Sequence, residues 1–147
     1  MVLTHLILQS SRPSPHGVVA FAPTAIQFFD RLSDHAKANA DTDTVTVPRL
    51  ERCSSSYVGD SGVARTDPLV SGVFVPFAAS WPKTLVLVGT GDVLIDASRE
   101  LEKRLSALNL PVEVVEYHER PHLWWRMRAF SEDIRDATTR IAQFTLE

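Results

Sequence analysis

The sequence has one cysteine, little net charge and no long apolar run, and each shortage excludes a class of protein. A single cysteine, Cys53, cannot form an internal disulfide, which is typical of a reducing compartment. No stretch approaches the roughly 18 apolar residues of a transmembrane helix, so no membrane span is expected. The formal net charge of −3 gives no reason to expect nucleic acid as a partner.

The start of the chain also lacks targeting features. The residues MVLTHLILQSSR have no basic n-region and no small-residue cleavage site, so they do not resemble a signal peptide and favour a cytoplasmic location.

The 147 residues suffice for one compact domain and are too few for two. No cluster has the spacing of metal ligands, and no glycine-rich loop follows a strand to hold a phosphate. We therefore expect no metal and no cofactor.

Three short apolar runs predict β-strands, at residues 17–21, 84–89 and 112–117. The second run is apolar almost throughout, so it is expected to be covered on both faces, as in a parallel sheet. Helices are predicted at residues 2–9, 28–40, 47–57, 97–108 (with Asp96 as N-cap) and 130–144. This alternation predicts an α/β fold of about three parallel strands flanked by helices.

Chemically useful residues follow the second and third predicted strands. Asp92 comes shortly after the second strand, and His118 and His122 come just after the third. Functional groups of α/β sheets gather beyond the carboxyl ends of the strands. An aspartate followed by a histidine is the order of the last two members of a Ser…Asp…His triad, in which histidine takes the serine proton and aspartate fixes the histidine tautomer.

Three segments resemble motifs from the C-terminal half of hormone-sensitive-lipase-like carboxylesterases, the α/β hydrolase fold-3 family. DPLVS (67–71) resembles the DP-x-x-SP segment of that family, with Gly72 in place of proline; TLVLVGTGDVLID (84–96) and VVEYHERPH (114–122) resemble its two later motifs. The resemblance implies that Asp92 is the triad acid and His122 the triad base. It also implies cofactor-independent cleavage of small esters through an acyl-enzyme.

The two earlier motifs of that family are missing. There is no His-Gly-Gly oxyanion motif and no G-D-S-A-G-G nucleophile elbow. The resemblance therefore implies that residues 1–147 form a single partial α/β-hydrolase domain lacking the N-terminal half. Such a chain alone would be inactive and would act on a small ester substrate only if completed by the missing half.

Two other functional interpretations remain open. The chain could be a catalytically inactive pseudo-enzyme or a small-molecule binding module on the truncated fold. An unrelated flavodoxin-like receiver is disfavoured, because GVVAFAPT (17–24) places no acidic residue after the first strand.

The run Gly59-Asp60-Ser61-Gly62 resembles a nucleophile motif only superficially. Val63 stands where the second glycine of G-x-S-x-G belongs, and the preceding residues are polar. We therefore interpret Ser61 as part of a surface turn.

Each candidate also has a non-catalytic interpretation. Asp92 could be a simple turn residue, and His122 could pack on Trp124 and Trp125, of which at most one would line a pocket. His118 is a competing base or an exposed loop residue, and Cys53 is expected to be an inert thiol.

The first strand would pair with the missing nucleophile strand. Its edge, near Val18–Phe21, is therefore expected to be exposed in this chain and to allow self-association.

Overall fold

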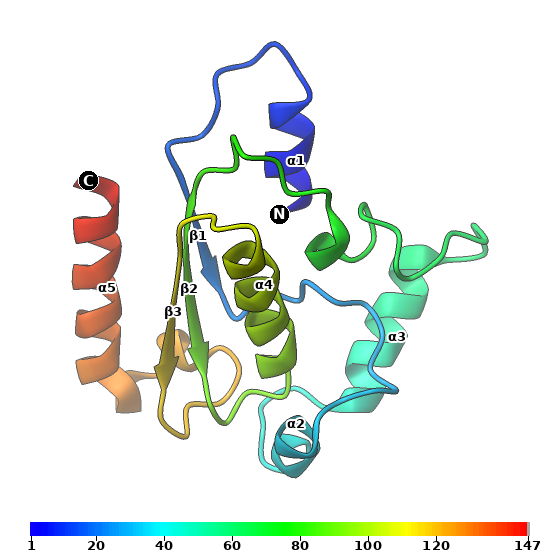
Figure 1. Cartoon of the computed structure of the whole chain (residues 1–147). Coiled ribbons are helices and arrows are strands. Elements are labelled where there is room, and N and C mark those ends of the chain that lie inside the picture. The colour runs from blue at the N-terminus through cyan, green and yellow to red at the C-terminus, as the bar shows by residue number, and fades with distance from the viewer. Residues whose placement is uncertain (147) are drawn as a thin grey trace.

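The computed structural model describes residues 1–146, and its centre is a parallel sheet of three strands in the order β1-β2-β3 (Figure 1). The strands are β1 (Gly17–Phe21), β2 (Lys83–Gly89) and β3 (Val112–Tyr117). Helix α4 (Ile95–Ala107) covers one face of the sheet, and α5 (Ser131–Leu146) covers the opposite face. The predicted α/β fold with about three parallel strands is confirmed.

Three further helices lie on the α4 side of the sheet or at its end. They are α1 (Val2–Leu8), α2 (Asp34–Asn39) and α3 (Val47–Val58). Short 3₁₀ turns occur at Gly72–Phe74 (η1), Trp124–Arg126 (η2) and Arg128–Phe130 (η3). In Figure 1, α2 lies near the end to which the strand arrows point, which is where functional groups gather in parallel sheets. No helix in the described part of the chain is both long and apolar enough to cross a membrane.

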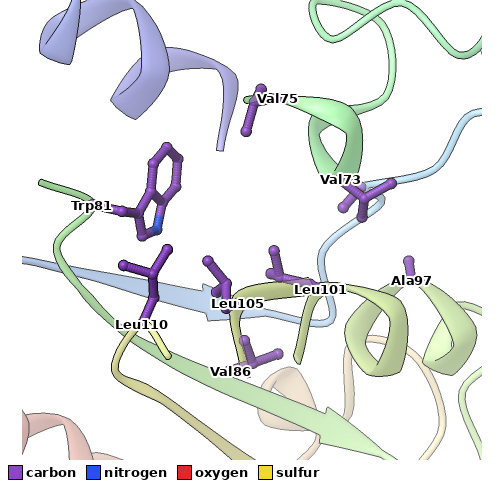
Figure 2. Packing of buried hydrophobic residues seen from close by; sticks show 9 residues of the cluster. Val73, Val75, Trp81, Val86, Ala97, Leu101, Leu105 and Leu110 are labelled. Atoms are coloured by element: carbon purple, nitrogen blue, oxygen red, sulfur yellow. The ribbon is translucent and has the colours of Figure 1, made fainter. Parts of the chain in front are cut away.

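The central strand β2 is buried on both faces, as its apolar sequence predicts. Its residues alternate between two hydrophobic clusters, because successive side chains of a strand point to opposite faces. Val86 belongs to the cluster with Leu101 and Leu105 of α4, and Leu85 and Leu87 belong to the cluster on the α5 side. Figure 2 shows Val86 facing Leu101 and Leu105, which are four residues apart on one side of α4. Burying each such leucine contributes about 1.5–3 kcal/mol, so this packing fixes α4 against the sheet.

The helix predicted over residues 28–40 is wrong in its first half. Helix α2 begins only at Asp34, after Ser33, whose hydroxyl accepts a hydrogen bond from the N–H of Ala36 at 3.2 Å. The carboxylate of Asp96 accepts from the N–H and the hydroxyl of Ser33 at 2.7 and 2.6 Å. Ser33 is thereby held in an extended conformation that ends any helix approaching from Phe29, which is buried in the core instead.

The same contact corrects the prediction for Asp96. Helix α4 begins at Ile95, and Asp96 is in its first turn and is not its N-cap. Its carboxylate binds Ser33 of another segment, so Asp96 links the start of α4 to the start of α2. The other three helix predictions, near residues 2–9, 47–57 and 130–144, are confirmed to within two residues at each end.

Candidate active site

Asp92 and His122 lie side by side at the carboxyl end of the sheet. Strands β2 and β3 are parallel and in register up to Gly89 and Tyr117, so the loops that follow them start at the same edge. Nδ1 of His122 lies 3.0 Å from Oδ2 of Asp92. The Asp92 side chain is fully buried, and that of His122 is 15% exposed. The pair therefore has one member shielded from water and one that reaches the surface.

The buried carboxylate of Asp92 uses both of its oxygens. Oδ1 accepts from the N–H of Leu94 at 2.7 Å, and Oδ2 faces His122. Burial raises the pKa of Asp92 above its ordinary value, while the hydrogen bonds from His122 and Leu94 act in the opposite direction. These two bonds favour the ionised form that a histidine-orienting aspartate needs.

The contact with Asp92 assigns the tautomer of His122. An ionised carboxylate only accepts hydrogen bonds, so the ring proton is assigned to Nδ1 and Nε2 is left as a base. Within residues 1–146 no group forms a hydrogen bond with Nε2. The ring of Trp125 packs edge-on against the His122 imidazole, with centroids 6.0 Å apart, whereas Trp124 is fully buried in the core. Of the two tryptophans, Trp125 is therefore the one that lies beside the imidazole, and a role in lining a pocket stays a prediction.

The loops after β2 and β3 are joined directly by hydrogen bonds. The N–H of Gly91 donates to the carbonyl of Arg120 at 3.1 Å, and the N–H of Glu119 donates to the Thr90 hydroxyl at 2.7 Å. Glu119 and Leu123, on either side of His122, have φ angles of 54° and 63°. These left-handed residues turn the chain sharply and so return His122 towards Asp92.

A third segment, between α2 and α3, holds the main chain of both residues. Nδ2 of Asn39 donates to the carbonyl oxygens of Thr90 and Asp92 at 2.9 and 3.2 Å. The Asp43 carboxylate accepts from the N–H groups of His122 and Val93, and the Thr44 hydroxyl donates to the carbonyl of His122 at 2.7 Å. Residues 39–43 are mostly polar, and their sequence does not identify these partners. The contacts join residues 50 to 79 positions apart, and no local pattern reveals them.

Within residues 1–146, none of the other candidate side chains forms a hydrogen bond with Asp92 or His122. The hydroxyl of Ser61 donates to the carbonyl of Val58 at 2.7 Å, in the turn after α3, on the opposite side of the molecule from the loop that follows β3 (Figure 1). The His118 side chain is 88% exposed and lies near Glu119, and Cys53 is exposed. Among residues 1–146, no group of three or more His, Cys, Asp or Glu side chains is arranged to hold a metal ion.

Comparison with known families identifies the family of the chain. The model of the Abhydrolase_3 family, described as an alpha/beta hydrolase fold, matches residues 1–126. The chain belongs to this α/β-hydrolase family. No curated protein matches the chain.

Solved structures with the same fold include esterases and a lipase. The structure of EstE5 soaked in ethyl alcohol has a TM-score of 0.85 at 20% identity, and the match covers 97% of this chain and 47% of EstE5. A hormone-sensitive lipase from a metagenome library has a TM-score of 0.78 at 26% identity, covering 96% of this chain and 50% of the lipase. An esterase from the bacterial hormone-sensitive lipase family has a TM-score of 0.79 at 22% identity, covering 97% and 46%.

The chain thus spans about half the length of these structural neighbours. The resemblance to hormone-sensitive-lipase-like hydrolases that the motifs indicate is confirmed.

Proposed function

We propose that Asp92 and His122 are the acid and base of a serine carboxylic-ester hydrolase. The observation that carries the proposal is the 3.0 Å contact between a fully buried carboxylate and a histidine whose Nε2 has no partner within residues 1–146. In acyl transfer, Nε2 of such a histidine takes the proton of a serine hydroxyl and later returns it to the leaving alcohol. Asp92 would hold the Nδ1–H tautomer and stabilise the imidazolium.

The nucleophile and the oxyanion hole would come from a segment outside these 147 residues. Ser61 cannot serve without a large rearrangement, because it lies in the turn after α3. The esterase neighbours are about twice as long as this chain, which supports a partial α/β-hydrolase domain that is completed by a second half. The substrate would be a small ester, as the names of the neighbours suggest, and the chain alone would not hydrolyse it.

The test combines gene sequence and assay. The DNA upstream of the Met1 codon is read for an in-frame G-D-S-A-G-G elbow, and the extended polypeptide is assayed with a short-chain chromogenic ester. We expect hydrolysis that His122→Ala lowers by about 10³-fold or more and that Ser61→Ala leaves unchanged, with no hydrolysis by residues 1–147 alone. Absence of such an elbow, or hydrolysis that survives His122→Ala, would contradict the proposal.

A second candidate function is small-molecule binding without catalysis. An open cavity of about 710 Å³ lies at the loops that follow β2 and β3; it is lined by residues that include Asn39, Thr90, His118 and Glu119, and neither member of the pair lines it. Saturable binding of an ester by the extended polypeptide, without turnover and without an effect of His122→Ala, would favour this alternative.

The open edge of β1 supports a proposal about assembly. Within the described residues β1 pairs only with β2, so its other edge has no strand beside it. A groove of about 280 Å³ runs along this edge, lined partly by Val18, Val19, Tyr57 and Leu69. In the chain alone, a second copy would occupy this edge.

A further inference from the structure

We infer that Asp43 is a positioning residue for the Asp92–His122 pair, an inference that rests on the proposed function. Asp43 does not contact either reacting side chain. Its Oδ1 accepts from the N–H of His122 at 2.6 Å, and its Oδ2 accepts from the N–H of Val93 at 2.7 Å. One carboxylate therefore fixes the main chain of His122 and of the residue next to Asp92.

The pair needs such a fixed point because its members stand on separate loops. The side-chain contact between Asp92 and His122 is a single hydrogen bond of 3.0 Å. Hydrogen bonds to an ionised acceptor are roughly twice as strong as neutral ones. Two of them on one half-buried carboxylate tie the two loops to a common point.

Residues close to Asp43 in the chain also hold the main chain of Asp92 and His122 in place. Oδ1 also accepts from the N–H of Thr44 at 2.6 Å, which fixes the carboxylate to its own loop. The Thr44 hydroxyl donates to the carbonyl of His122, so His122 is held at both its N–H and its C=O. Asn39 holds the carbonyl of Asp92 from the same segment. The stretch from Asn39 to Thr44 thus contacts four main-chain atoms at the pair: His122 N and O, Val93 N and Asp92 O.

A purely structural tie would stabilise the fold without affecting the His122 ring. The variant Asp43→Asn distinguishes a role in stabilising the fold from a role in positioning the His122 ring. It keeps the size of the side chain and one carbonyl oxygen. Its amide NH₂ replaces the second oxygen and faces an N–H group, so either His122 or Val93 loses its acceptor. The matched control is Asp41→Asn, which removes a carboxylate that is exposed in the same loop.

The readout is the imidazole of His122 in the ¹⁵N-labelled chain, and no turnover is needed. The Nδ1 proton is assigned by its loss in His122→Ala. We expect Asp43→Asn to speed exchange of this proton with water by about tenfold and to increase the Nε2–H tautomer, with no change in Asp41→Asn. Asp43→Glu, which keeps the charge, should restore part of the protection. An Nδ1 proton in Asp43→Asn with the wild-type exchange rate and tautomer would overturn the inference.

If Asp43→Asn does not fold, Asp43→Glu takes its place. The added methylene moves the carboxylate relative to the N–H groups of His122 and Val93 and is expected to speed Nδ1 exchange by about threefold; wild-type exchange in this variant would overturn the inference. The ester assay tests the serine-hydrolase chemistry, whereas the NMR experiment tests the geometry of the pair. Failure of one is therefore distinguishable from failure of the other.

Discussion

The main-chain carbonyl of Arg120 lies where a β-carbon on Gly89 would have to be. Only glycine lets the loop after β3 pass so close to the end of β2. We expect Gly89→Ala to lower the free energy of unfolding by about 1–3 kcal/mol, because the loop that carries His122 must move away. Urea unfolding measures the loss. In Gly91→Ala, the matched control, the new β-carbon would lie 3.2 Å from the same carbonyl, so the loss should be smaller. Equal stability of Gly89→Ala and wild type would show that the two loops are not in contact.

The buried carboxylate of Asp92 predicts a pH dependence of stability. Burial raises the pKa of Asp92 in the folded chain, so the folded state holds this proton to higher pH than the unfolded state does. The contribution of this proton to the free energy of unfolding is therefore fully present below the pKa of Asp92 in the unfolded chain and is lost as pH rises through its pKa in the folded chain. The loss is about 1.4 kcal/mol for each unit by which the two pKa values differ.

Asp92→Asn removes this titration. Urea unfolding from pH 4 to pH 8 should show the wild type losing stability relative to Asp92→Asn as pH rises. Asp41→Asn, at an exposed site, should show no such trend. A wild type that gains stability over Asp92→Asn with rising pH would mean that the bonds from His122 and Leu94 outweigh burial.

Ser61 should be dispensable. Its hydroxyl makes a hydrogen bond to Val58 at the exposed end of α3. We expect Ser61→Ala to change the free energy of unfolding by less than about 0.5 kcal/mol, as is usual for surface sites. Thermal or urea unfolding checks this value. A loss of several kcal/mol would indicate that this turn has a structural role that its contacts do not show.

The edge of β1 should determine the association state of the isolated chain. Val19, in the middle of this strand, is 36% exposed. Sedimentation at increasing concentration should reveal association of the wild type, and Val19→Lys should reduce it, because a charge on an edge strand opposes pairing. Val63→Lys is the matched control, since Val63 is an exposed valine in the loop after α3. A wild type that remains monomeric at all concentrations would exclude pairing through β1.

The parts of the fold that short apolar runs encode could be predicted from the sequence. Residues 84–89 are apolar because β2 is covered on both faces, and this pattern needs no knowledge of the partners. Asp92 and His122 could be placed because both follow strand ends and match family motifs. Their contact follows from parallel pairing of β2 and β3.

The remaining features depend on contacts between distant segments. The start of α2 is set by Asp96, which lies 63 residues after Ser33. The partners of Asp43 could not be predicted either, because they lie 50 and 79 residues away and are main-chain groups, which carry no sequence signature. Local periodicity does not report hydrogen bonds between distant residues. The helix predicted for the first half of residues 28–40 is therefore wrong.

The ties from Asn39, Asp43 and Thr44 all end on main-chain atoms of the two loops. An N–H or C=O group is present whatever side chain a residue carries. Substitutions of side chains in these loops can therefore leave these main-chain ties in place. Part of the geometry of the pair is therefore encoded in a segment that contributes neither of its two side chains.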